Sequence, residues 1–161
     1  MKPVLASLAI ASLLLACMAP LAAEAPPGGI VLRRDVAPPN VPLDKRYDQM
    51  DEAQRALLKA RYAGMGAGDE PPWPVDGLGP VMLALRQGAD VYRVRGQLDM
   101  TVEVGPDGAA RSVAVYEDAG DAQFTKFAAS LLMTTKYKPA VCSGQPCAMA
   151  WPLQVTMSRG R

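Results

Sequence analysis

Residues Gly96 to Gly108 read GQLDMTVEVGPDG and carry the strongest structural pattern in the chain. Apolar and polar side chains alternate along the first part of this stretch, as in a β-strand with one buried face. The apolar members are Leu98, Met100, Val102 and Val104. The tripeptide Pro106-Asp107-Gly108 favours a turn, and the alternation returns over residues 111–117. The sequence therefore predicts a β-hairpin.

A helix and a further strand are predicted after the hairpin. Asp121 can cap the helix, and the apolar side chains that follow it recur at helical spacing until Pro139 ends the helix. These side chains are Phe124, Phe127, Ala128, Leu131 and Leu132. Apolar residues alternate again over residues 149–157. The order strand, strand, helix, strand predicts a small α+β domain, in which an antiparallel three-stranded sheet packs on one helix.

Two of the three cysteines, Cys142 and Cys147, lie close together in the sequence. The residues between them, Ser-Gly-Gln-Pro, favour a turn that brings the two side chains together. In an oxidising compartment such a pair forms a disulfide, which stabilises the fold by about 2 kcal/mol for so short a loop. The remote alternative is a thiol-redox protein that uses Cys142 and Cys147, although redox sites usually have two residues between their cysteines.

The N-terminal residues are typical of a secretory signal peptide. The uncharged apolar run Val4–Ala16 is too short to span a bilayer and has the length of a signal-peptide core. Small residues follow it, so cleavage after Ala23 is expected to remove residues 1–23 and to release the chain into the periplasm. The stretch Leu14–Cys17 also resembles a bacterial lipobox. The alternative is therefore a lipid anchor at Cys17, which would hold the protein on the membrane of the cell envelope.

Three segments precede the predicted α+β domain. Residues 24–42 are rich in proline and are predicted to form an extended tether without a strand. Residues 43–66 are predicted to form an amphipathic helix that Asp44 caps and that a run of glycines ends. Residues 67–79 form a Gly/Pro-rich linker, in which Trp73 is expected to be a buried anchor.

The α+β domain itself is expected to span residues 80–158. It opens with a short predicted helix over residues 80–87, because Pro80 suits the first turn of a helix and Gly88 suits its end. Val81 and Leu85 give this helix an apolar side.

The composition argues against several functional classes. The chain contains no histidine and therefore lacks an imidazole base, a Ser-His-Asp relay and a histidine metal ligand. Its 17 basic and 16 acidic residues leave a net charge of +1, which does not provide the concentrated basic surface of a nucleic-acid-binding protein. The sequence therefore predicts a protein that is not an enzyme, with no cofactor, no metal and no nucleic-acid partner.

An ordered set of motifs runs through the predicted domain. It consists of Gly96, Pro106-Asp107-Gly108, Phe127-Ala128-Ala129, Tyr137-Lys138-Pro139-Ala140, Gly144-Gln145-Pro146 and a closing apolar strand. In this order the motifs resemble the C-terminal domain of TonB-type energy transducers, over residues 80–157 and best from Gly96 onward. The resemblance implies a small TonB-C-terminal-like β-β-α-β domain. It also implies a periplasmic module that takes an extended peptide of an outer-membrane transporter as an added strand.

Strand addition needs no catalytic residue, because main-chain hydrogen bonds supply the affinity. The resemblance implies that the last strand, Ala148–Ser158, is the edge that receives the partner. Its candidate contact residues are Ala148, Ala150, Pro152, Gln154 and Thr156. A full transducer has an N-terminal membrane helix with a functional histidine and a long Pro-rich spacer. This chain has a cleavable-looking segment and a short tether instead, so a secreted relative is expected rather than a working transducer.

The expected partner is a protein or peptide at the cell envelope, and a segment of a TonB-dependent transporter is the leading example. Contact with a membrane is expected only if Cys17 is lipidated. The alternative is a structural periplasmic protein that self-associates as a homodimer through its sheet edge and has no transport role.

Overall fold

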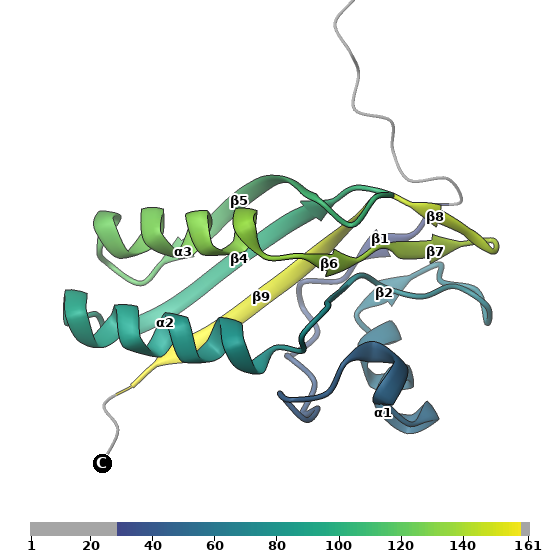
Figure 1. Ribbon diagram of the computed structural model, residues 1–161, viewed down its shortest axis with the longest axis horizontal. Helices are drawn as coiled ribbons and strands as arrows, with labels where there is room; N and C mark the ends of the chain where they lie inside the picture. Colours follow the sequence, from purple (N-terminus) through teal and green to yellow (C-terminus); the bar gives the residue numbers. More distant parts are fainter. Residues whose placement is uncertain (1–28, 159–161) are drawn as a thin grey trace, which may run out of the picture.

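The computed structural model describes residues 29–158 and shows a mixed α+β protein built around one antiparallel sheet (Figure 1). Strand β4 (Gly96–Val104) lies in the middle, between β5 (Ala110–Asp118) and β9 (Met149–Met157). The turn between β4 and β5 falls at residues 106–108, as the sequence predicts. β9 runs antiparallel to β4 in a continuous register along the whole strand.

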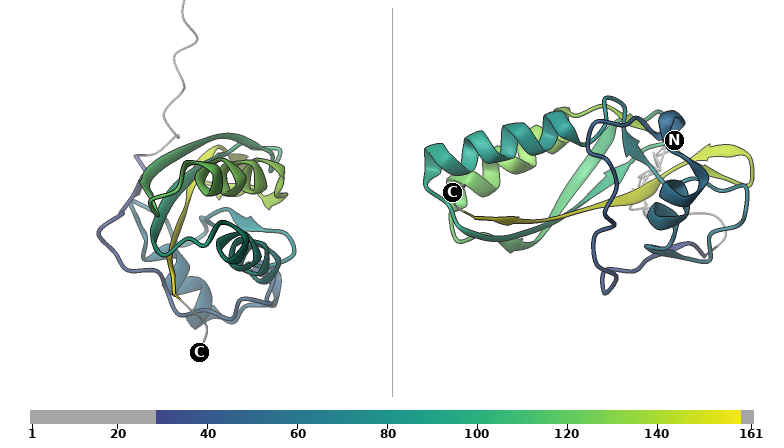
Figure 2. Two further views of the ribbon diagram at one scale, coloured as in Figure 1. Left: turned by 90° about the vertical axis from the view of Figure 1, so that its left-hand side faces the viewer. Right: turned by 90° about the horizontal axis from the view of Figure 1, so that it is seen from below.

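Two helices, α2 (Gly79–Tyr92) and α3 (Ala122–Thr134), lie side by side over one face of the sheet (Figures 1 and 2). Asp121 caps α3 as predicted, because its Oδ1 accepts a hydrogen bond of 2.7 Å from the N–H of Phe124. The prediction that the helix continues until Pro139 is wrong, because α3 ends at Thr134, where the backbone of Thr135 is extended. The prediction of a sheet packed on one helix is wrong, since α2 covers the same face.

The prediction that Gly88 ends the first helix is also wrong. α2 continues past this glycine to Tyr92 and ends where Arg93 adopts a left-handed conformation with φ of 56°. Gly88 is buried, and a Cβ placed there would collide with the ring of Phe127 in α3. The glycine is therefore a point of close approach between the two helices.

The core lies between the sheet and the two helices. Its centre is the set of alternating apolar residues of β4, all of them completely buried, namely Leu98, Met100, Val102 and Val104. They belong to one cluster with Leu85 of α2, Phe124 and Leu132 of α3, and Trp151 of β9. Each large apolar side chain buried in this way contributes about 1.5–3 kcal/mol relative to exposure.

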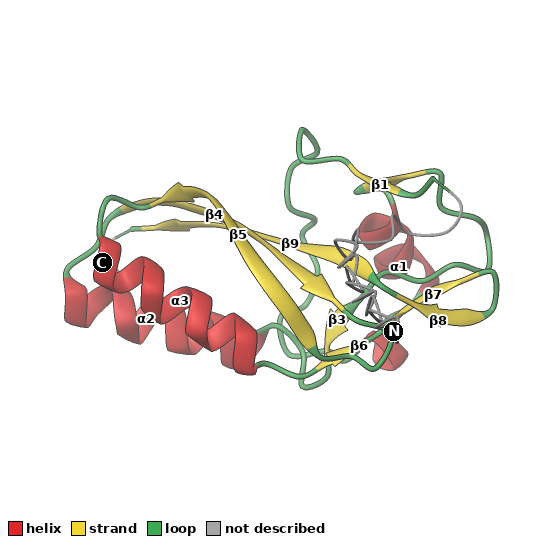
Figure 3. Ribbon diagram, turned by 90° about the horizontal axis from the view of Figure 1, so that it is seen from above, coloured by secondary structure: helices red, strands yellow, loops and turns green. Residues whose placement is uncertain are grey.

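Residues 29–78 form short elements that gather at one end of the sheet (Figure 3). They are β1 (Val31–Leu32), the 3-10 helix η1 (Tyr47–Gln49), α1 (Glu52–Lys59), β2 (Tyr62–Ala63) and β3 (Trp73–Pro74). β1 pairs with β2, and β3 pairs with β6 (Tyr137–Lys138), which follows α3. The chain between β1 and η1 starts on the side of the sheet opposite the helices and then reaches the start of α2 (Figure 2), where the N–H of Gly79 donates a hydrogen bond of 2.6 Å to the carbonyl of Leu43.

The predicted helix over residues 43–66 is wrong in both its length and its start. α1 covers only Glu52–Lys59, and Asp51 rather than Asp44 caps it by accepting a hydrogen bond of 2.8 Å from the N–H of Gln54. Met50 interrupts the helical run because its backbone is extended, with φ of −78° and ψ of 141°. Its side chain is nevertheless buried, so the apolar spacing reflects packing without a continuous helix.

The described part of the proline-rich segment 24–42 packs against the rest of the protein. Ile30 and Val41 are buried, and the N–H of Arg33 donates a hydrogen bond of 2.7 Å to the carbonyl of Arg61. The prediction that this segment contains no strand is wrong, because β1 pairs with β2. β1 can pair with β2 because the prolines of this segment lie before and after β1, so the residues of β1 keep their backbone N–H groups.

The prediction of a buried tryptophan in segment 67–79 is confirmed. Trp73 is buried, and its Nε1 donates a hydrogen bond of 3.1 Å to the carbonyl of Lys45. Its ring also meets Trp151 of β9 edge to face, with 6.4 Å between the ring centres. Trp73 therefore holds this segment on the central sheet.

The predicted disulfide is present. It lies in a small hairpin at the same end of the sheet as the N-terminal elements (Figures 1 and 3). The hairpin consists of β7 (Ala140–Cys142) and β8 (Gln145–Cys147). The bond joins Cys142 to Cys147, whose Cα atoms are 5.8 Å apart, and both side chains are buried.

The predicted signal peptide, residues 1–23, and the candidate lipidation site Cys17 lie outside the described residues. Residues 24–28 of the proline-rich segment do so as well. Among the helices within residues 29–158, none combines the length and the apolar character that crossing a membrane requires.

Candidate partner-binding edge

β9 forms one edge of the central sheet, and it contains most of the residues predicted to contact a partner strand. Ala150, Pro152, Gln154 and Thr156 lie within β9, and Ala148 immediately precedes it. Within residues 29–158, β9 pairs with β4 and with no other strand. The second side of β9 is therefore a sheet edge.

The backbone groups of the candidate contact residues face this free edge. Pro152 has no N–H, so in a strand it suits a position that faces away from the neighbouring strand. The carbonyl of Ala150 also faces outward, because it accepts a hydrogen bond of 2.9 Å from Tyr62 Oη. Backbone groups alternate between the two sides along an antiparallel strand. The N–H and C=O groups of Gln154 and Thr156 therefore point away from β4.

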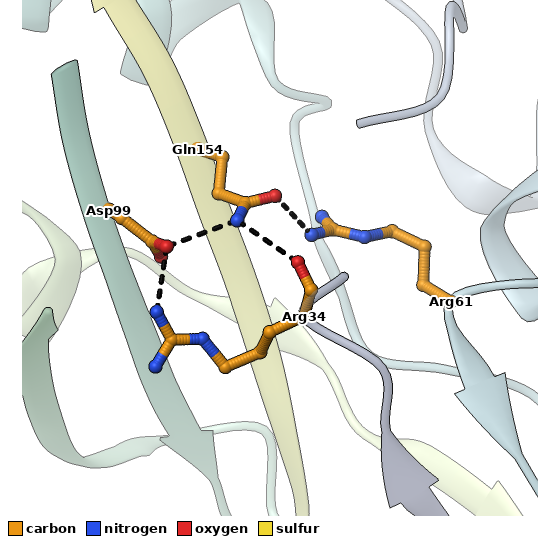
Figure 4. A network of polar contacts seen from close by, with 4 residues as sticks. All are labelled: Arg34, Arg61, Asp99 and Gln154. Carbon is orange, nitrogen blue, oxygen red and sulfur yellow. Dashed lines mark hydrogen bonds and ion pairs between the residues drawn. The ribbon is translucent and has the colours of Figure 1, made fainter. Parts of the chain in front are cut away.

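A polar network joins strands β4 and β9 to the N-terminal segments (Figure 4). It lies on the face of the sheet opposite the helices, because Asp99 and Gln154 alternate with the core residues Leu98, Met100 and Leu153. Asp99 of β4 is 7 % exposed, and its Oδ2 accepts hydrogen bonds from Arg34 Nη2 at 2.7 Å and from Gln154 Nε2 at 3.0 Å. Gln154 Oε1 accepts a further hydrogen bond of 2.6 Å from Arg61 Nη2. The network thus ties β4 and β9 to the segments on either side of α1.

Arg34 contacts all three strands of the sheet. It pairs with Asp99 of β4, and its carbonyl accepts a hydrogen bond of 3.4 Å from Gln154 Nε2 of β9. Its guanidinium carbon lies 3.0 Å from the centre of the Tyr116 ring of β5, where the negative face of the ring attracts the cation. Arg34 is therefore the contact that holds the proline-rich segment across the sheet.

Sequence reasoning missed Arg34, Arg61 and Asp99. The alternating pattern of β4 predicts that Asp99 lies on the polar, exposed face. The residues next to it in the sequence do not indicate that a distant segment buries it. The sequence feature that could have pointed to Arg34 is the pair Arg33-Arg34, which stands within a proline-rich, largely apolar stretch.

The network is tightly enclosed. Arg61 is buried, and burial lowers the pKa of its guanidinium, while the neighbouring Asp99 opposes this effect. In and beside this network, four buried polar atoms have no hydrogen-bond partner within the described residues, namely Arg34 Nε, Arg61 Nε, Asp99 Oδ1 and Thr101 Oγ1. Such atoms oppose folding, so the rest of the network and the core must compensate for them.

The first half of the free edge is covered by the protein itself. The cavity beside it, lined by residues that include Tyr62, Trp73 and Pro152, has a volume of about 60 Å³. Small-molecule pockets usually measure roughly 300–1,000 Å³. This space is therefore a packing gap between β9 and the N-terminal elements rather than a ligand site.

The second half of the free edge is open. A hollow of about 440 Å³ lies between α2 and residues 156–158, and another of about 260 Å³ lies between residues 34–38 and residues 154–156. The described charged residues that line the larger hollow are one carboxylate, Asp90, and three arginines, namely Arg86, Arg93 and Arg95. The local charge at this end of β9 therefore favours an acidic partner.

Within residues 29–158, no three cysteine, aspartate or glutamate side chains are grouped so that they could hold a metal ion. Comparison of the chain with protein-family models, with curated proteins and with solved structures gave no match. The class of the protein therefore follows from its own structure, which is a mixed α+β fold whose central sheet has β5 and β9 as edge strands within the described residues.

Proposed function

We propose that this protein is a non-catalytic binding module of the periplasm that receives an extended peptide segment of a protein partner as an added strand on β9. The observation that carries the proposal is the outward direction of the N–H and C=O groups of Gln154 and Thr156, which the alternation along β9 implies, beside the two hollows at this end of the edge. Added strands are held by such main-chain groups, and pockets for alternate side chains supply the selectivity.

The structure limits the length and chemistry of the partner segment. Pro152 offers no donor, and Tyr62 occupies the carbonyl of Ala150, so pairing begins after Pro152. The arginines Arg86, Arg93 and Arg95 flank the open half. A short strand with acidic side chains is the segment that meets both conditions.

The resemblance to the C-terminal domain of TonB-type transducers supports the same function. The strand–strand–helix–strand order on which the resemblance rests corresponds to β4, β5, α3 and β9. By this resemblance the partner is a periplasmic segment of an outer-membrane transporter, and the signal-like residues 1–23 support secretion. The cleavable-looking N-terminal segment favours a secreted relative over an energy transducer.

The test is a backbone NMR titration of the mature chain with a short extended peptide rich in threonine, valine and glutamate, blocked at both ends. A peptide with lysine in place of glutamate serves as the charge control. Binding of the acidic peptide is expected to shift the amide signals of residues 153–158. Shifts that leave residues 148–158 unaffected would defeat strand addition on β9.

Two substitutions of one residue separate strand addition from other kinds of contact. Thr156→Pro removes an outward N–H that β4 does not use, so binding is expected to weaken about tenfold or more while the fold is retained. Thr156→Val keeps the N–H and is expected to bind as the unchanged chain does. Equal affinities of the two variants would contradict the proposal. Light scattering in the same samples shows whether the protein pairs with itself instead.

A further inference from the structure

Strand β5 forms the second edge of the central sheet, on the side of β4 away from β9. Within residues 29–158 it pairs with β4 and with no other strand. None of its nine residues is buried, and Val115 and Tyr116 are 43 % and 56 % exposed. Natural sheet edges are often protected by proline or lysine, and the β5 sequence ARSVAVYED contains neither. An exposed edge strand of this kind can pair with a strand of another chain.

The backbone groups of Val113 and Val115 face this edge. Val102 and Met100 of β4 direct their backbone groups to β9, because the carbonyl of Ala150, at an alternate position of β9, faces away from β4. In the register between β4 and β5, Val113 lies opposite Val102, and Val115 lies opposite Met100. The N–H and C=O groups of both β5 valines therefore point outward from the sheet.

Two irregular steps limit the kind of strand that fits β5. Arg111 and Tyr116 have no partner in the register with β4, so each is the extra residue of a β-bulge. Residues 112–115 form the regular stretch between the bulges. Bulges discourage the pairing of an ordinary strand with an edge. The strand that fits best has its own irregular steps in matching places.

A second copy of β5 has this property when it runs antiparallel and Ala114 lies opposite Ala114 of the second copy. Val113 then lies opposite Val115 of the second copy, so the outward-facing residues of the two strands meet. The irregular step 111–112 lies opposite the irregular step 116–117 of the second copy. A closed two-fold pair of this kind is the commonest arrangement of identical chains.

The charges of β5 select the same register. Arg111 lies opposite Glu117 of the second copy, and the two-fold symmetry repeats this contact. Opposite charges across a strand pair favour pairing, and like charges oppose it. A parallel pair would place arginine opposite arginine and glutamate opposite glutamate. An antiparallel pair that is shifted by two residues would leave both charges opposite uncharged side chains.

Both side chains of this contact are accessible. Glu117 is exposed and forms no ion pair within residues 29–158. Arg111 Nη2 lies 2.7 Å from Asp107 Oδ2, and both of these side chains are more than half exposed. Exposed ion pairs of this kind are weak, and the guanidinium has further N–H groups that can donate to a second carboxylate. Arg111 can therefore contact Glu117 of a second copy.

We infer that two copies of this protein pair through β5 and join their three-stranded sheets into one continuous antiparallel sheet. The regular stretch of β5 is short, so the pair is weak, with a dissociation constant on the order of 0.1 mM. β9 lies on the other edge of the sheet. Pairing through β5 is therefore independent of strand addition on β9.

The test is analytical ultracentrifugation of the mature chain at concentrations up to about 1 mM, where a reversible monomer–dimer equilibrium is expected. Val113→Pro removes an outward N–H that β4 does not use, so dimerisation is expected to weaken about tenfold or more while the fold is retained. Val113→Thr keeps this N–H and is the matched control, which is expected to dimerise as the unchanged chain does. Circular dichroism shows that both variants are folded.

Charge reversal tests the register. Arg111→Glu and Glu117→Arg each place like charges opposite each other, so each is expected to weaken dimerisation about tenfold. The chain with both substitutions restores opposite charges and is expected to dimerise as the unchanged chain does. An equal mixture of the two single variants also places opposite charges at both contacts, so the two variants are expected to pair with each other.

Three outcomes would overturn the inference. They are a monomer at every concentration, equal dimerisation of the Val113→Pro and Val113→Thr variants, and a failure of both the doubly substituted chain and the mixture to regain pairing. Dimerisation that Thr156→Pro weakens and Val113→Pro does not would assign the contact to β9 instead. Peptide binding to β9 is measured separately in the Val113→Pro variant, so failure at one edge can be told apart from failure at the other.

Discussion

Asp99 shows how a single residue acquires its role from distant parts of the chain. Its place in β4 is on the polar side of an alternating strand, yet its side chain is buried because Arg34 and Gln154 close over it. The carboxylate forms an ion pair with Arg34, whose side chain is 33 % exposed. Partial exposure of the arginine weakens the pair relative to a fully buried one.

Replacing this carboxylate tests the strength of the network. Asp99→Ala is expected to lower the free energy of unfolding by about 2 kcal/mol, because the arginine and the amide of Gln154 lose their common acceptor. Urea denaturation measures the change. Asp35→Ala is the matched control, since it removes an exposed pair with Arg33 that is worth at most about 0.5 kcal/mol. Similar losses in both variants would show that the network does not hold the N-terminal segment on the sheet.

At the scale of elements, the contact between α2 and α3 depends on Gly88. A glycine inside a helix normally lowers its stability by about 1 kcal/mol relative to alanine. Here the absent side chain makes room for the ring of Phe127. The two helices can therefore cover the sheet together, and the helix continues through a residue that usually favours its end.

A double-mutant cycle separates these two effects of Gly88. Gly88→Ala is expected to lower the free energy of unfolding by about 1 kcal/mol, because overpacking against Phe127 outweighs the gain in helix propensity. In a Phe127→Ala background the collision is absent, so the same change is expected to raise the free energy of unfolding by about 1 kcal/mol. Urea denaturation of the four proteins provides the measurement. The same sign in both backgrounds would show that the ring does not limit this position.

At the scale of the whole molecule, residues 29–78 pack on the central sheet instead of forming a free tether and linker before it. Their contacts with the sheet include the Arg34–Asp99 pair, the hydrogen bond from Tyr62 to Ala150 and the packing of Trp73 on Trp151. They close the first half of the β9 edge and leave the second half open. The extent of the candidate binding edge is therefore set by the N-terminal segment.

Hydrogen exchange tests whether this segment is docked. The amide of Arg33 donates to the carbonyl of Arg61, so its exchange is expected to be at least about a hundredfold slower than in a free peptide of residues 29–42. NMR-detected exchange of both samples provides the comparison. Equal rates in the protein and the peptide would mean that the segment is a free tether.

Local spacing along the chain was sufficient to predict the β4–β5 hairpin, the start of α3 at its Asp121 cap, the alternation of β9 and the Cys142–Cys147 disulfide, but not the end of α3 at Thr134. Each of these features depends on residues a few positions apart, and the periods of strands and helices are therefore visible in the sequence. The same reasoning selected β9 as the candidate edge and included Gln154 and Thr156. For residues 43–66 the helical spacing of the apolar residues led to a wrong prediction of one long helix. These side chains are buried from several short elements instead.

The features that the sequence did not predict depend on contacts between residues far apart in the chain. The burial of Asp99, the passage of α2 beyond Gly88 and the hydrogen bond from Tyr62 to Ala150 each join segments that lie far apart in the chain. Such contacts leave no periodic trace in the sequence, because the side chains that meet are brought together only when the sheet, the helices and the N-terminal elements pack. The strands and their alternation are thus local properties of this chain, whereas the open half of the β9 edge and the exposed edge of β5 are properties of the packed molecule.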